Sequence, residues 1–189
     1  MPRLRLSEAP VETVHGRDDR EFGIREISPS DRDRLAAFVA GLSPETRYKR
    51  FLHSVRQLSE KELTDFTNLD HRDADAIVAV DARGELIGVA RYGHDSDDRE
   101  VAEVAVTVAD EWQGRGVGTI LLRRLATAAA AAGVRRFAAS CFADNAEMLK
   151  LFDELGTTRR TGFCGGVVEL EIALPNLTDE GDPGGSAAE

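Results

Sequence analysis

The sequence predicts a mixed α/β fold built on a mostly antiparallel sheet. Two strand-like runs, 76–80 and 86–92, flank the turn sequence Asp-Ala-Arg-Gly, so we expect them to form a hairpin. A third strand, 100–108, follows another polar turn, and a single apolar helix, 117–132, then crosses over to a strand at 134–142. Strands and helices do not alternate throughout the chain, which argues against a doubly wound parallel sheet.

The N-terminal half is predicted to contain one strand and three helices. The strand covers 24–27. Ser30 or Asp31 caps the first helix, whose apolar residues recur at helical spacing: Leu35, Phe38, Val39 and Leu42. A second helix covers 45–52, and the third, 59–66, begins with the Ser-x-x-Glu pattern of a capping box. All three helices therefore precede the hairpin in the chain.

The C-terminal half continues with helices that each have one apolar face. The crossover helix carries its apolar face on Val117, Leu121, Leu125, Ala128 and Ala132. A last helix is predicted at 145–155, with a buried stripe of Met148, Leu149, Phe152 and Leu155. A closing strand at 167–174 completes the sheet.

Length and composition indicate one domain with polar ends. The chain has 189 residues, of which 42% are hydrophobic. We expect a flexible segment at 1–20, a folded domain at 21–175 and a disordered acidic tail at 176–189, because both ends are polar and poorly patterned. No apolar run approaches the ~20 residues of a membrane span, and the N-terminus lacks the apolar core of a signal peptide. The protein is therefore expected to be cytoplasmic, with no membrane partner.

The net charge and the scattered cysteines and histidines narrow the function classes. A formal charge of −10 repels nucleic-acid phosphates and attracts amines, although solubility alone also explains much of it. The two cysteines, Cys141 and Cys164, and the four histidines have neither disulfide nor zinc spacing. We therefore expect no nucleic-acid partner and no metal, and we interpret Cys141 as a buried strand residue rather than a nucleophile.

The strongest functional signal is the segment 104–118, which reads V-A-V-T-V-A-D-E-W-Q-G-R-G-V-G. Gly114, Gly116 and Gly118 allow close approach of a ligand to the backbone, and the first N–H groups of the following helix lack partners within the helix. Such a loop favours a pyrophosphate group. The Lys-Ser/Thr pair of a P-loop is missing after Gly118, and the next strand lacks the acidic residue of a dinucleotide fold.

The pattern Gln113-x-x-Gly116-x-Gly118 resembles the (Arg/Gln)-x-x-Gly-x-(Gly/Ala) signature of the GNAT N-acetyltransferases, and the likeness extends over roughly 22–174. It implies the GNAT fold, a mixed sheet with helices on both faces, and acetyl-CoA as cosubstrate. The implied cofactor contacts are Val106, Thr107, Val108, Gln113, Gly114, Arg115, Gly116, Val117, Gly118, Thr119 and Asn145. Asn145 is explained equally well as a helix cap, and Trp112 either covers the loop or packs on the sheet.

Three further motifs resemble the bacterial Pat-like protein lysine acetyltransferases. They are L-S-P-E-T-R-Y-K-R-F at 42–51, L-D-H at 69–71 and I-G-V-A-R-Y at 87–92. In that branch a glutamate in the strand before the glycine loop is the general base, and Glu103 occupies the matching position. The tyrosine that commonly protonates the departing thiolate in the wider family is replaced by Phe152. The resemblance therefore implies direct transfer without that acid.

Strand alternation gives Glu103 small and apolar neighbours. Glu103, Ala105 and Thr107 share one face of the strand, and the three valines at 104, 106 and 108 share the other. We expect burial among these residues to tune Glu103 as the base that deprotonates an amine. The alternative is a surface strand residue paired with an arginine.

The sequence therefore predicts an enzyme that moves an acetyl group from acetyl-CoA to an amine, in the first place a protein lysine. Two alternatives stay open: acetylation of a small amine such as a polyamine, amino sugar or antibiotic, and a non-catalytic CoA sensor. Larger Pat-like proteins carry an acyl-CoA-synthetase-like or cyclic-nucleotide-binding domain, for which we expect no room in 189 residues. The expected assembly is a monomer or a homodimer.

Overall fold

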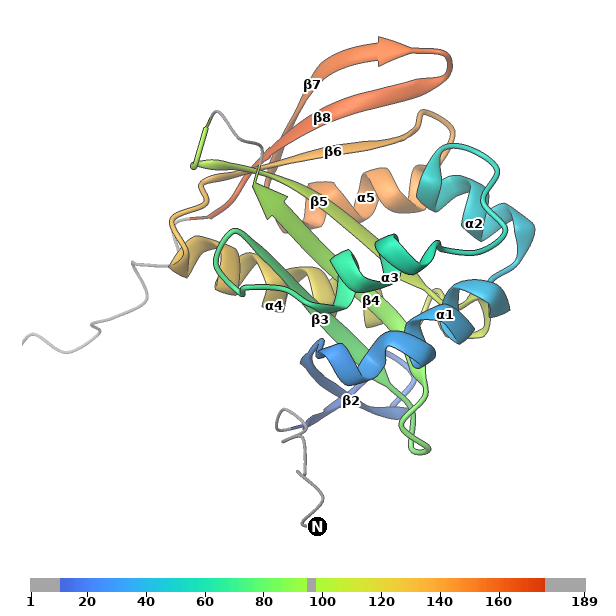
Figure 1. Ribbon diagram of the computed structural model, residues 1–189. Coiled ribbons are helices and arrows are strands. Elements are labelled where there is room, and N and C mark those ends of the chain that lie inside the picture. Colours follow the sequence, from blue (N-terminus) through green and yellow to red (C-terminus); the bar gives the residue numbers. More distant parts are fainter. Residues whose placement is uncertain (1–10, 95–97, 176–189) are drawn as a thin grey trace, which may run out of the picture.

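The computed structural model describes residues 11–94 and 98–175, whose strands form one eight-stranded sheet (Figure 1). The order across the sheet is β1-β2-β3-β4-β5-β6-β8-β7. The strands are Glu12–His15 (β1), Glu21–Glu26 (β2), Ala74–Val80 (β3), Leu86–His94 (β4), Val101–Val108 (β5), Arg136–Phe142 (β6), Thr157–Cys164 (β7) and Val167–Ala173 (β8). Neighbouring strands are antiparallel except β5 and β6, which are parallel. The predicted mixed and mostly antiparallel sheet is confirmed.

Helices cover both faces of this sheet, as the family resemblance implies. They are α1 (Arg32–Gly41), α2 (Pro44–Phe51), α3 (Glu60–Thr67), α4 (Val117–Ala131) and α5 (Ala146–Leu155), with short 3-10 turns at Pro29–Asp31 and Asp110–Trp112. Figure 1 shows α1, α2 and α3 in front of the sheet and α4 and α5 behind it. Two buried apolar clusters fill these layers: one joins α4 and α5 to the sheet, and the other joins α1 and α3 to it.

Most of the helices form where their local signals predict. In α3 the capping box is present, because the Ser59 hydroxyl accepts the Glu62 N–H at 3.2 Å and the Glu62 carboxylate accepts the Ser59 N–H at 2.7 Å. The buried face of α4 differs from the predicted one. It consists of Val117, Leu121, Leu122, Leu125, Ala126 and Ala129. Ala132 is exposed because the helix ends at Ala131, one residue before it.

Two edge strands are absent from the predictions. Residues 12–15 form β1, which pairs with β2, so the flexible segment predicted for 1–20 is corrected at this point. β7 pairs with β8 at the other edge. Neither strand shows the alternation of a half-buried strand, because most of its residues are exposed on both faces. Residues 1–10 and the predicted tail at 176–189 lie outside the described residues.

A buried ion pair fixes the chain where β2 leads into α1. The guanidinium of Arg25 donates two hydrogen bonds to the Asp31 carboxylate, at 2.6 and 2.7 Å, and the Ser28 N–H donates a third at 3.0 Å. Burial raises the pKa of Asp31, but the bonds from Arg25 and Ser28 outweigh burial and leave that pKa below its ordinary value. The paired charge therefore ties the N-cap of α1 to the sheet.

Candidate active site

The two parallel strands at the centre of the sheet separate along their length. β5 and β6 share only three register pairs, which join 101–103 to 136–138, and Glu103 pairs with Ala138 at the last of them. Beyond this point the strands diverge and leave a cleft of about 460 Å³. The walls of the cleft come from β5, the glycine loop, the first turn of α4, β6, α5 and α2. The sheet itself therefore provides an opening beside Glu103.

The glycine loop enters α4 through left-handed backbone. Gly114 and Gly116 have φ of +72° and +88°, and Gly116 is the N-cap of α4. A Cβ at Gly116 would lie 3.1 Å from Cγ of Arg17, and one at Gly118 would lie 3.3 Å from a methyl group of Leu151. The loop and the first residues of α4 line the cleft. The first N–H groups of a helix have no partners within the helix, so this end of α4 suits an anion.

Gln113 and Asp110 tie this loop to α2. The Gln113 side-chain amide donates to the Val108 carbonyl at 3.0 Å and to the Thr46 hydroxyl at 3.2 Å. Asp110 accepts from the Ser43 N–H at 2.9 Å, the Ser43 hydroxyl at 2.6 Å and the Thr46 hydroxyl at 2.7 Å. Burial raises the pKa of Asp110, but the Ser43 bonds outweigh it and lower the pKa overall. The start of α2 is therefore anchored to the loop.

The other side of α2 reaches β6. Tyr48 of α2 stacks on Phe142 of β6, with ring centroids 5.1 Å apart and ring planes 13° from parallel. Tyr48 itself is 49% exposed. Because one end of α2 is held at the loop and this ring contact joins α2 to the diverging strand, α2 forms the wall of the cleft that spans from β5 to β6.

Glu103 lies in the cleft but is exposed, so the expectation of a buried base is wrong. β6 pairs with β5 only as far as Glu103 and Ala138, and Glu103 lines the cleft that opens there. The alternative, an arginine partner, is also not met as a direct contact, since Glu103 makes no ion pair within 4.0 Å in the described part of the chain. Its charge acts through space on Arg50 and Arg91, where it partly offsets the lowering of their pKa values by burial.

The cleft brings together almost all of the predicted cofactor residues. Lining it are Val106, Thr107, Val108, Gln113, Gly114, Gly116, Val117, Gly118, Thr119 and Asn145. The side chain of Arg115 instead turns away, since its guanidinium pairs with Asp18 and its Nε donates to the Glu111 carbonyl at 2.8 Å. Asn145 lines the cleft and also caps α5, where its side chain accepts the Met148 N–H at 3.3 Å. Both explanations of Asn145 therefore fit the geometry.

Three aromatic and sulfur residues near the cleft have packing roles. Trp112 is buried and meets Phe22 edge-on, with ring centroids 6.2 Å apart, which favours the packing interpretation. Phe152 is buried in the wall of the cleft. Cys141 is buried as well, and burial raises the pKa of its thiol, so it suits an inert strand residue.

Sequence reasoning missed Arg17, which comes from the N-terminal segment. Its N–H donates to the Arg115 carbonyl at 2.8 Å, and its side chain passes over Gly116. Its guanidinium lies 3.6 Å from the Glu154 carboxylate of α5 and lines the cleft beside the glycine loop. No local signal marks this arginine, because it sits in a polar stretch of mixed charges.

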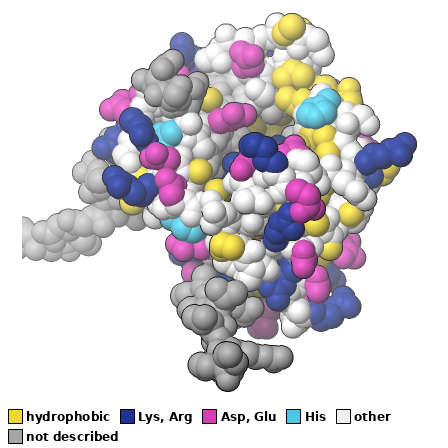
Figure 2. All heavy atoms as spheres, in the orientation of Figure 1, with side chains coloured by type: hydrophobic (Ala, Val, Ile, Leu, Met, Phe, Trp, Pro, Cys, Tyr) yellow, Lys and Arg dark blue, Asp and Glu magenta, His cyan; other side chains and the backbone are white. Residues whose placement is uncertain are grey.

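The cleft is locally positive in an acidic protein. Its cations are Arg17, Lys49, Arg50 and Lys150, and its carboxylates are Glu103, Glu147 and Glu154. Acidic and basic side chains are interspersed over the face drawn in Figure 2, and the whole chain carries −10. The excess of one cation among these lining residues favours an anionic ligand.

Residues 11–94 and 98–175 contain neither a candidate membrane-spanning helix nor a candidate metal-binding cluster. None of the helices there has the length and apolar character needed to cross a membrane. No group of three or more His, Cys, Asp or Glu side chains there is placed to hold a metal ion.

Comparison with protein families places this architecture among known ones. The sequence model described as "Acetyltransferase (GNAT) family" matches residues 38–157. The GNAT domain of PAT from S. lividans has a similar structure, with a TM-score of 0.80 and 36% sequence identity, and the match covers 88% of this chain and all of that one.

Two relatives are similar over most of the chain. Acetyltransferase Pat from Mycolicibacterium smegmatis is 36% identical over 174 residues, which are 92% of this chain and 51% of the relative. Acetyltransferase PA5475 from Pseudomonas aeruginosa is 35% identical over 142 residues, which are 74% of this chain and 76% of that protein. The chain thus spans about half the length of the M. smegmatis protein.

Proposed function

The chain belongs to the GNAT family of acetyltransferases, and from this premise we propose that it transfers the acetyl group of acetyl-CoA to a protein lysine side chain, with Glu103 as general base. The observation that carries this proposal is the separation of β5 from β6 directly after Glu103. Around one cleft lie a carboxylate, the glycine loop and a strand edge that pairs with no strand of the described chain.

The cleft suits each part of acetyl-CoA. The N–H groups at the start of α4, which have no partners within the helix, would hold the pyrophosphate, with the loop from Gln113 to Thr119 around it. Among residues 11–94 and 98–175, the edge of β5 that faces β6 has no strand partner beyond Glu103, so Val106 to Val108 can bond the amides of the pantetheine arm as a neighbouring strand would. Arg17 would add a side-chain cation to the phosphates.

The acceptor amine has to be neutral before it can attack. A free lysine has a pKa of ~10.4 and is mostly protonated at neutral pH, so a base is needed. An exposed carboxylate at the apex of the cleft can take this proton directly or through one water. Glu103 therefore serves as the acceptor of the proton, without the burial that the sequence led us to expect.

Transfer then forms the bond from the amine nitrogen to the thioester carbonyl carbon and breaks the bond from that carbon to sulfur. Phe152 lines the cleft where the wider family commonly has a tyrosine, and its ring cannot donate a proton. A thiol of pKa near 8.5 leaves as a thiolate without such help. The resemblance of three motifs to Pat-like enzymes supports a protein lysine as acceptor.

A substrate panel tests this proposal. The purified chain is incubated with acetyl-CoA and either a set of folded proteins or a set of free amines, and CoA release and acetylated lysines are measured. Samples without the chain correct for spontaneous acetylation. We expect site-selective acetylation of protein lysines. Turnover restricted to polyamines, amino sugars or antibiotics would end the lysine assignment, and binding without any turnover would favour a CoA sensor.

A further inference from the structure

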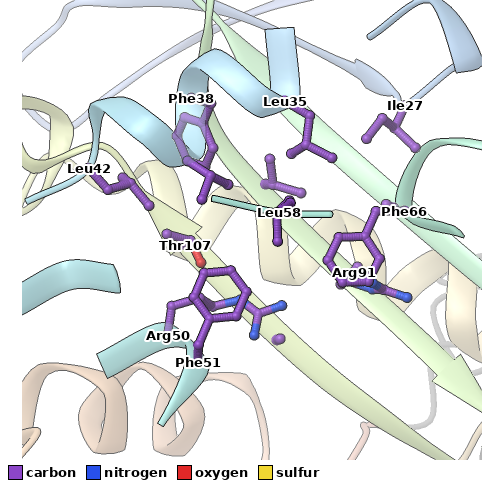
Figure 3. Close-up of a pocket in the computed structure, with 14 residues that line it drawn as sticks. Ile27, Leu35, Phe38, Leu42, Arg50, Phe51, Leu58, Phe66, Arg91 and Thr107 are labelled. Atoms are coloured by element: carbon purple, nitrogen blue, oxygen red, sulfur yellow. The ribbon is translucent and has the colours of Figure 1, made fainter. Parts of the chain in front are cut away.

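Two half-buried arginines, Arg50 and Arg91, lie within the electrostatic reach of Glu103. Arg50 is near the C-terminal end of α2, and Arg91 lies on β4. Both line a small cavity of about 30 Å³ between the sheet and α1, α2 and α3, whose other walls are almost entirely apolar. Figure 3 shows the guanidinium of Arg50 directed toward the side of the cavity where Arg91 lies.

Both guanidinium groups lie against aromatic rings. Arg50 lies over the ring of Phe51 at 5.0 Å, and Arg91 lies over the ring of Phe66 at 4.0 Å. Neither arginine forms an ion pair with a carboxylate within the described residues. Aromatic faces attract a cation, but they satisfy few of the five N–H donors that each guanidinium carries. Both groups therefore keep donors available for an anion.

The two cations are unfavourable together. Burial lowers the pKa of Arg50 to about 10, with repulsion from Arg91 as the second cause, and burial also lowers the pKa of Arg91. Glu103 acts on both of them only through space. Two like charges at one apolar cavity cost stability unless an opposite charge joins them. An anion bound between the two guanidinium groups would offset this electrostatic cost.

We propose that Arg50 and Arg91 form a subsite for a carboxylate carried by the acceptor. This inference rests on the proposed function, since the amine lies at Glu103. Arg50 lines both the cleft and the cavity, as do Ala105 and Thr107, so the two spaces adjoin at these residues. A short group attached to the amine would reach the arginines from the cleft. The cavity admits about one water-sized or carboxylate-sized group. The carboxylate therefore belongs a few bonds from the amine.

Such a carboxylate has two sources, an acidic side chain beside the acceptor lysine of a protein and the α-carboxylate of a free amino acid. The experiment separates them with two matched pairs of acceptors. One pair is a lysine peptide with a flanking glutamate and the same peptide with glutamine. The other is an amino acid and its carboxamide. For each pair we measure the ratio of kcat/KM for the charged acceptor to kcat/KM for the neutral one.

The ratio is expected to exceed about tenfold in at least one pair, because a charge-assisted bond contributes more than a neutral one. Arg50→Gln and Arg91→Gln should each bring this kcat/KM ratio close to one, even if the kcat/KM for the neutral acceptor also changes. Arg83→Gln, in the exposed turn between β3 and β4, is the matched control and should preserve it. If Arg91→Gln does not fold, Arg91→Lys keeps the charge but loses the planar fork, and it should still lower the ratio.

The pair with the raised ratio identifies the source of the carboxylate, an acidic peptide side chain or the α-carboxylate of an amino acid. A raised ratio in either pair supports the subsite. A ratio near one in the unmodified protein, or a ratio that survives both arginine substitutions, overturns it. Equal turnover of charged and neutral acceptors would leave the proposed function standing and reject the subsite alone. Absence of turnover with every amine would reject both.

Discussion

Glu103 of β5 stands opposite Ala138 of β6 at the last register pair that these parallel strands share. Beyond this pair, β5 and β6 share no further register pair in the described chain, and the cleft begins. The proposed base and the free strand edge therefore both lie at the end of the parallel ladder. This links the chemistry to the sheet and not to a mobile loop.

Replacement of Glu103 by glutamine removes the proton acceptor and keeps the shape. We expect kcat/KM for acetyl transfer to fall about 100-fold or more, as for the loss of a general base, while the Kd for acetyl-CoA stays within about twofold. Steady-state kinetics and calorimetry measure the two quantities. Glu85→Gln, in the exposed turn after β3, should change neither. Normal turnover in Glu103→Gln would remove this residue from the mechanism.

The glycine loop can be tested against a glycine with the same backbone strain elsewhere. Gly116 and Gly84 have φ of +88° and +81°. Alanine at either position should cost about 1 kcal/mol of unfolding free energy. Gly116→Ala should also weaken acetyl-CoA binding about tenfold or more, because its Cβ presses on Arg17, whereas a Cβ at Gly84 meets nothing within 4 Å. Equal cofactor affinity in the two variants would contradict the placement of the pyrophosphate.

Arg17 offers a test that depends on the phosphates alone. Arg17→Gln should raise the Kd for CoA about tenfold, because a charge-assisted bond to a phosphate is lost, and should leave the affinity for acetyl-pantetheine unchanged. The wild-type difference between these two ligands should shrink as salt is added. Arg83→Gln is the control for the general loss of a positive charge. If both ligands lose affinity equally, Arg17 only supports the loop.

The buried Arg25–Asp31 pair predicts a stability that depends on pH. The pKa of Asp31 is lowered on folding, so its contribution is fully present above its unfolded pKa of ~3.9 and is lost as the pH falls through the folded value. Asp31→Asn should cost about 3 kcal/mol at pH ~7, because it leaves Arg25 buried without a charge partner. Urea unfolding should show this difference shrinking at pH values below ~4. A constant difference across the pH range would contradict the account.

Much of the fold is predictable because its signals are local. The turn before Gly84, the capping box at Ser59 and the apolar spacing of α1 each act over a few residues, and all three are present in the structure. β1 and β7 depend on pairing with distant strands, and their own residues show no alternation. Edge strands of this kind need tertiary information.

In the candidate site, too, some features have local sequence signals and others depend on tertiary contacts. The glycine spacing identifies the loop because left-handed backbone and close approach both require that residue. Sequence alone could not show that Glu103 is exposed, since this depends on where β5 leaves β6. Nor could it bring Arg17 to Gly116 across about a hundred residues of chain. The cytoplasmic location and the monomeric or homodimeric state stay predictions.

The most direct test is a calorimetric titration of the purified chain with acetyl-CoA at two temperatures. Binding buries apolar surface and therefore changes the heat capacity, so the binding enthalpy varies with temperature. It cannot be zero at both temperatures. We expect one acetyl-CoA per chain, an affinity that falls in Gly116→Ala, and an affinity in Gly84→Ala equal to that of the unmodified protein. No heat at either temperature, from protein shown to be folded, would contradict the assignment of this cleft to the coenzyme.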